Sequence, residues 1–145
     1  MSEEDLRGAT CLKRYACFPS KCKQNWDANE KRIVAVGGAH CSTPFGGTLF
    51  SFVATDLYGH LILLGWGWSA EPENKADVEY YFSLFRKMYT NVRMIISDQG
   101  SAFEMLRKEI NNEAKRKHDS DSAEEFPVWM GCIVHIGTAA GLRNS

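Results

Sequence analysis

The chain has 145 residues and a mass of 16.3 kDa, which fits a single domain. Its 17 basic and 18 acidic residues give a formal net charge of −1, so no overall positive field attracts nucleic acid or an anionic membrane. Hydrophobic residues make up 44% and charged residues 24% of the chain, which excludes a disordered tail, a collagen-like fibre and a disulfide-rich knot.

The sequence has no apolar segment of membrane-spanning length. The longest apolar run, Leu61 to Trp68, has eight residues, whereas a spanning helix needs about 20. Residues 1–7 are acidic and have no apolar core, so they do not form a secretory signal. We therefore expect an intracellular protein that does not cross a membrane and whose five cysteines stay reduced.

Residues 1–31 are predicted to form a weakly ordered, basic N-terminal segment, because they contain Pro19 and few large apolar side chains. We interpret the basic residues of this region as a solvated surface, with a nucleic-acid contact as the alternative. From Cys11 to Arg32 the chain has two acidic residues, Asp27 and Glu30, and six basic residues: Lys13, Arg14, Lys21, Lys23, Lys31 and Arg32.

Three cysteines also lie in this segment. Cys11, Cys17 and Cys22 are separated by five and four residues, and zinc sites favour gaps of two to four. Only one gap fits and no adjacent histidine completes a set, so free thiols are favoured over a structural zinc site.

Three successive segments are typical of β-strands. Residues 33–36 form a continuous apolar run that is β-branched at three positions, which suits a strand covered on both faces. Residues 48–55 and 60–68 are rich in strand-forming residues, and residues 56–59 between them have the composition of a tight turn. The sequence therefore predicts an antiparallel meander.

The hydrophobic period changes to that of a helix after Asn74, which is suited to cap a first helical turn. A short apolar strand over 92–96, a second helix from Ser101 and a strand over 128–134 are expected to follow. We predict a helix over 75–89 with one apolar stripe, formed by Val78, Tyr81, Phe82, Phe85 and Met88.

The order β-β-β-α-β-α-β predicts an α/β fold with a mixed sheet. Connection rules make the strand at 92–96 parallel to the strand at 33–36, which gives the order 3-2-1-4-5 with strands numbered along the chain. The carboxyl ends of these two strands would meet at one edge, where open α/β sheets bind ligands. Position 37 and Asp98 follow the two strands there, and carboxylates at both positions would hold Mg²⁺ ions.

Residues 32–145 resemble one known family through several short motifs. In chain order these are Arg32–Cys41, Phe52–Ile62, Glu73-Asn74 with Phe82 and Phe85, Ile95–Gly100, and Phe126-Pro127 with Cys132 and His135. They are similar to motifs in the transposase domain of Mutator-like elements (MULEs), a member of the ribonuclease H-like superfamily. The resemblance implies a two-metal mechanism of DNA transposition and recombination, DNA as the partner and a nuclear location.

The sequence departs from this family at the acidic residues that hold the metal ions. The family uses three: Gly37 occupies the first position, Asp98 matches the second, and the third falls beyond residue 145. A lone carboxylate cannot hold two cations that each need about six oxygen ligands. We therefore expect a truncated and catalytically inactive relative of this family, either degenerate or domesticated. We expect it to bind Mg²⁺ or Mn²⁺ only weakly, and DNA only weakly.

Cys132 and His135 carry a second metal prediction. The resemblance implies that they form half of a Zn²⁺ site, and their spacing of two intervening residues suits such a pair. The other half is not found among the 145 residues, so a buried thiol beside a histidine at the solvent edge is the alternative.

Three further functions stay open. An active transposase fragment of a longer gene would need an acid at position 37. A nucleotide-binding ATPase would use the glycines at 37–38 and 46–47 to cradle phosphate, although such proteins need two domains of this kind. A protein-interaction module independent of nucleic acid would use exposed aromatic residues such as Trp66 or Trp68.

Overall fold

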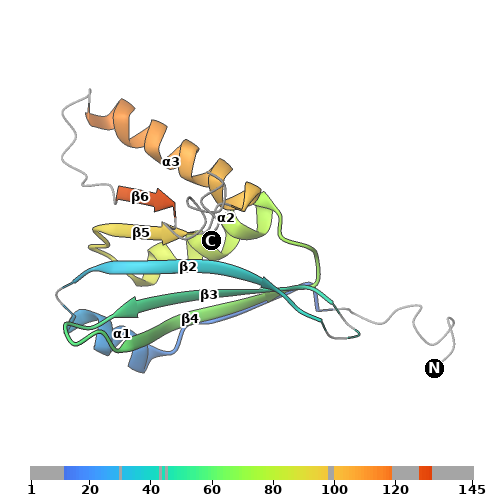
Figure 1. Cartoon of the computed structure of the whole chain (residues 1–145), viewed down its shortest axis with the longest axis horizontal. Helices are drawn as coiled ribbons and strands as arrows, with labels where there is room; N and C mark the ends of the chain where they lie inside the picture. Colours follow the sequence, from blue (N-terminus) through green and yellow to red (C-terminus); the bar gives the residue numbers. More distant parts are fainter. Residues whose placement is uncertain are drawn as a thin grey trace, which may run out of the picture.

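A computed structural model describes residues 12–29, 31–42, 44, 46–97, 100–118 and 128–131. These ranges form six strands and three helices (Figure 1). In chain order they are β1 (Arg14–Cys17), α1 (Ser20–Asp27), β2 (Ile33–His40), β3 (Thr48–Thr55), β4 (Leu61–Ser69), α2 (Lys75–Met88), β5 (Met94–Ser97), α3 (Ser101–His118) and β6 (Val128–Gly131).

The six strands form one mixed sheet in the order β1-β4-β3-β2-β5-β6. Strands β2, β3 and β4 make the predicted antiparallel meander. Strand β5 pairs in parallel with β2, and β6 pairs in parallel with β5, so the predicted α/β class and the parallel pairing of β2 with β5 are confirmed. Strand β1 is antiparallel to β4 and adds a sixth strand that the predicted five-stranded order lacks. In Figure 1 the strands rise from β4 at the bottom to β6 at the top.

The predicted weak order of the N-terminal segment is wrong for residues 12–29, which form β1 and α1. Trp26 of α1 is fully buried and meets Tyr89 edge-on, with ring centroids 5.9 Å apart. Phe18, between β1 and α1, packs on Phe52 of β3 at 5.6 Å. Two aromatic residues thus anchor a segment whose composition is otherwise polar, while residues 1–11 lie outside the described ranges.

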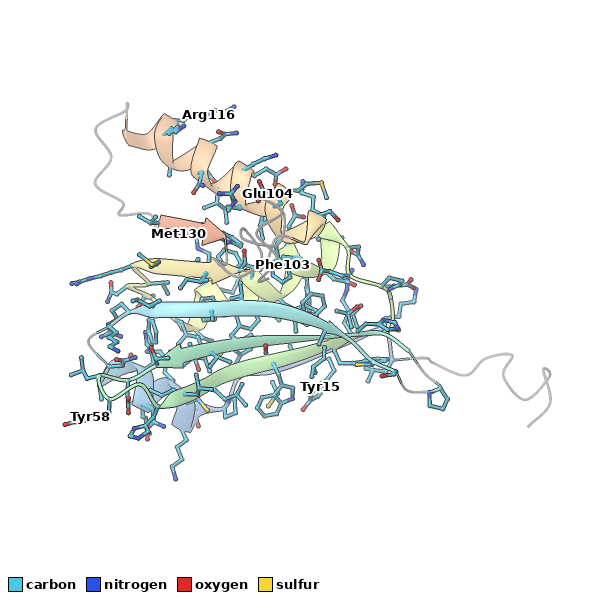
Figure 2. The ribbon with its side chains drawn as sticks, viewed as in Figure 1. Tyr15, Tyr58, Phe103, Glu104, Arg116 and Met130 are labelled. Carbon is cyan, nitrogen blue, oxygen red and sulfur yellow. The ribbon has the colours of Figure 1, made fainter. Side chains whose placement is uncertain are left out.

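All three helices pack on the same face of the sheet, which we call the core face. Phe85 of α2 stacks on Phe52 at 4.8 Å, and Phe103 of α3 lies 6.3 Å from Phe50, between its helix and the sheet (Figure 2). Trp26 brings α1 to this face through Tyr89 at the end of α2. The helix predicted over 75–89 is confirmed, with Asn74 as its N-cap accepting a hydrogen bond from the backbone N–H of Asp77 at 3.0 Å.

Two glycines of β4 leave room for aromatic rings on the core face. A Cβ atom at Gly65 would lie 2.1 Å from the ring of Phe18, and one at Gly67 would lie 2.3 Å from the ring of Tyr81. Distances this short do not occur between real side-chain atoms, so any larger residue would displace the rings. The glycines within the apolar run of β4 are therefore packing sites for β1 and α2.

Candidate functional site

The candidate site lies where β5 ends beside β2. The prediction that the first strand stops at position 36 is wrong, because β2 stays paired with β3 as far as His40 and Gly37 lies within it. Val36 of β2 is the register partner of Ser97, the last residue of β5, and Gly37 follows Val36 directly. A Cβ atom at Gly37 would have no neighbour within 4 Å. Position 37, where the resemblance predicts an acidic residue, is therefore open, and a carboxylate would fit there without a steric clash.

The other residues of the predicted site cannot be placed. Asp98, Cys132 and His135 lie outside the described residues, so their metal-binding roles remain predictions. Cys11 also lies outside, whereas Cys17 and Cys22 are present as half-buried free thiols. Within the described ranges, no three His, Cys, Asp or Glu side chains gather in a group that could hold a metal ion.

Glu73, in the loop before α2, approaches the same end of β2. A Cβ atom at Gly38 would lie 2.6 Å from Oε2 of Glu73, so glycine at this position leaves space for the carboxylate. Side chains alternate between the two faces of a strand. Gly38, paired with Phe50, belongs to the core face, and Gly37 belongs to the opposite face. The resemblance includes Glu73 in a motif but does not name it as a site residue. Its carboxylate lies near the candidate site, on the other side of β2 from position 37.

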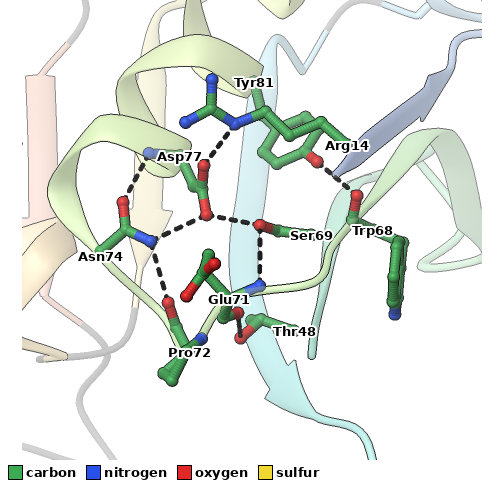
Figure 3. Close-up of polar contacts among 9 residues, drawn as sticks. All are labelled: Arg14, Thr48, Trp68, Ser69, Glu71, Pro72, Asn74, Asp77 and Tyr81. Carbon is green, nitrogen blue, oxygen red and sulfur yellow. Dashed lines mark hydrogen bonds and ion pairs between the residues drawn. The ribbon is translucent and has the colours of Figure 1, made fainter. Parts of the chain in front are cut away.

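A buried carboxylate holds the loop that carries Glu73 (Figure 3). Oδ2 of Asp77 accepts hydrogen bonds from Ser69 Oγ at 2.5 Å and Asn74 Nδ2 at 2.8 Å, and Oδ1 accepts one from Arg14 Nε at 2.5 Å. Burial by itself raises the pKa of Asp77. The hydrogen bonds from Ser69, Asn74 and Arg14, together with the positive charge of Arg14, outweigh burial, so the pKa lies below its ordinary value.

This cluster ties three elements together. It joins β1 through Arg14, the end of β4 through Ser69 and the first turn of α2 through Asp77. Tyr81, one turn further along α2, donates a hydrogen bond to the carbonyl of Trp68 at 2.5 Å. Asp77 is buried and its carboxylate accepts three side-chain hydrogen bonds within the chain, so its function is structural.

Asp56 does not reach the candidate site. Its Oδ1 accepts hydrogen bonds from the backbone N–H groups of Tyr58 and His60, both at 2.8 Å, and its Oδ2 contacts Nδ1 of His60 at 2.8 Å. Asp56 follows Thr55 at the far end of β3, whereas Gly37 pairs with Ser51 nearer the beginning of that strand. Its carboxylate closes the β3–β4 turn.

Several basic residues of the N-terminal region bind within the chain. Arg14 bonds to Asp77, Lys23 bonds to Asp27 at 2.7 Å, and Arg32 donates to the carbonyl of Trp26 at 2.8 Å while lying over its ring. Side chains bonded within the chain in this way are less available to pair with the phosphates of a nucleic acid. They favour a folded, solvated surface over a continuous nucleic-acid contact.

No family model, curated protein or solved structure matches the chain. None of the described helices is long and apolar enough to span a bilayer. The likeness to MULE transposases therefore depends on the short motifs and their order.

Proposed function

We propose that the chain is a transposase-derived domain with the ribonuclease H-like fold, catalytically inactive because Gly37 replaces the first metal-binding acid. The observation that carries this proposal is the position of Gly37. It follows Val36, the last residue of β2 that pairs with the parallel strand β5, and β5 leads directly to Asp98. A meander followed by two parallel strands is also the arrangement that the resemblance implies.

Three described carboxylates, Glu73, Asp77 and Asp56, do not compensate for the missing acid. Glu73 lies against Gly38 on the core face, Asp77 is held by three donors, and Asp56 closes the turn at the other end of β3. Two divalent ions bring four positive charges, and Asp98 alone would offset one of them. The residues present therefore do not fit a two-metal site, and we derive no reaction step through Mg²⁺ or Mn²⁺.

Weak DNA binding and a nuclear location belong to the same proposal. A net charge of −1 gives no overall attraction to phosphates, and Arg14, Lys23 and Arg32 of the N-terminal region are bonded within the chain. We retain Cys132 and His135 as half of a Zn²⁺ site whose remaining ligands would come from elsewhere.

A DNA-nicking assay in Mn²⁺ tests the inactivity. We expect no cleavage above background by the wild type or by Asp98→Asn, and none by Gly37→Asp, because two carboxylates are still one fewer than the family uses. Asp27→Asn, which changes an exposed carboxylate bonded to Lys23, is the matched control. Metal-dependent nicking by the wild type that disappears in Asp98→Asn but persists in Asp27→Asn would refute the proposal.

A second candidate function is a protein-interaction module on the same fold. It is favoured by the face of the sheet opposite the helices, where Trp66 and Trp68 are half-buried and several apolar side chains are exposed.

A further inference from the structure

The sheet face opposite the helices is apolar from one edge to the other. Register places on it the side chains that alternate with those of the core face, for example Leu63 opposite Val53 and Trp68 opposite Leu49. We call this the open face and define it by its exposed large residues, which are between 41% and 77% exposed. They are Tyr15, Leu49, Leu61, Leu63, Val128 and Met130.

The open face spans the whole sheet. Tyr15 lies on β1 and Met130 on β6, the two edge strands (Figure 2). Between them lie the half-buried Trp66 and Trp68 of β4. A monomer rarely exposes a continuous apolar patch of more than a few hundred Å², so a face of this extent marks an interaction surface.

This face carries no charge in the part of the chain that the structure describes. Arg14 is the only Asp, Glu, Lys or Arg in the six strands, and it points to the core face, where it binds Asp77. Charged residues make up 24% of the whole chain, so their absence from the open face is a marked depletion. Nucleic acid requires cations that pair with phosphates, and this face offers none.

We propose that the open face binds the open face of a second copy of this chain. In a two-fold symmetric dimer the same surface of both copies forms the interface. Like charges on that surface would repel each other across the interface, whereas a surface without charges avoids this repulsion. Two sheets pack face to face about 10 Å apart through interdigitating apolar side chains. Gly37 also lies on this face, where an acidic residue would place a charge in the contact.

The size of the face is sufficient for a stable dimer. Strands β2, β3 and β4 have eight or nine residues and are each roughly 27–30 Å long, whereas β1, β5 and β6 have four residues each and are roughly 13 Å long. With strands about 4.8 Å apart, the face has an area of roughly 600 Å², which matches the lower limit of about 600 Å² per partner for a specific interface. The inference depends on the open face and does not require the proposed function.

Sedimentation equilibrium of the full chain between about 1 and 100 μM tests the dimer. We expect a mass near twice the 16.3 kDa of one chain, and a blue shift of tryptophan emission with concentration as Trp66 and Trp68 lose water. Leu63→Lys should weaken the dimer by at least about tenfold in Kd, because it buries a charge in the contact. The matched control is Leu57→Lys, in the β3–β4 turn outside the face, which should leave Kd unchanged.

Circular dichroism shows whether Leu63→Lys folds, and Leu49→Lys replaces it if it does not. A wild type that stays monomeric up to about 100 μM contradicts the dimer. So does a dimer that a folded Leu63→Lys or Leu49→Lys variant leaves intact. A monomer that sediments with neutral phosphatidylcholine vesicles would assign the face to a lipid surface and overturn the inference.

Discussion

Asp77 is a buried acid whose negative charge is matched by Arg14, which is itself partly exposed to solvent. Because its pKa is lowered in the folded state, its contribution to the free energy of unfolding is complete above the unfolded pKa of about 3.9 and is lost as pH falls through the lower folded pKa. We expect Asp77→Asn to cost about 1–3 kcal/mol at pH 7 and to flatten the loss of stability in acid.

Urea denaturation between about pH 2.5 and 7 measures this effect. Asp27→Asn is the control, since Asp27 is an exposed acid in an ion pair with Lys23 and its removal should change the free energy of unfolding by less than about 1 kcal/mol. The same acid-induced loss in Asp77→Asn as in the wild type would show that Asp77 does not govern it.

Gly67 and Gly37 provide a matched pair of glycine substitutions on two strands. A Cβ at Gly67 meets the Tyr81 ring at 2.3 Å, so Gly67→Ala should lower the free energy of unfolding by about 1–3 kcal/mol. A Cβ at Gly37 has open space, so Gly37→Ala should be neutral or stabilise by up to about 1 kcal/mol. Denaturant titration of both variants measures the two changes. Equal decreases in the free energy of unfolding would show that the two positions do not differ in the space around a Cβ atom.

At the scale of elements, α2 packs aromatic side chains on the sheet. Phe85 is fully buried and stacks on Phe52 at 4.8 Å and on Tyr89 at 5.1 Å. Phe85→Ala should therefore lower the free energy of unfolding by about 3–5 kcal/mol. Met105→Ala on the exposed side of α3 should cost less than about 0.5 kcal/mol. A loss below about 1 kcal/mol for Phe85→Ala would contradict this packing.

Local sequence patterns predicted β2 to β5 and α2 because their signals lie within each segment. Runs of strand formers, the turn at 56–59 and the N-cap at Asn74 are all readable over a few residues. Strand β1 and helix α1 escaped prediction because contacts distant in sequence stabilise them. Trp26 packs on Tyr89, and Arg14 binds Asp77, 63 positions away. The Asp77 cluster was not predicted for the same reason, because Arg14 lies far from Asp77 in the sequence. Only the N-cap at Asn74 could be predicted from neighbouring residues.

Among the described residues, one face of the sheet is covered by helices and the open face carries no charged side chain, and Gly37 lies within β2 at the position where the resemblance predicts an acid. The order of the elements predicted the parallel pairing that places Val36 beside Ser97, whereas the continuation of β2 to His40 was not predicted. The proposed transposase origin and the proposed loss of catalysis both require that position 37 and Asp98 face each other.

Calorimetric titration of Mn²⁺ into the wild type, Gly37→Asp and Gly37→Asp/Asp98→Asn measures this directly. Leu57→Asp adds the same charge on the β3–β4 turn, away from the edge, and serves as the control. We predict weak binding by the wild type and Leu57→Asp, and binding at least about tenfold tighter by Gly37→Asp that is lost when Asp98 is also changed. No gain in Mn²⁺ affinity from Gly37→Asp would mean that positions 37 and 98 do not face each other, and would contradict the proposed site.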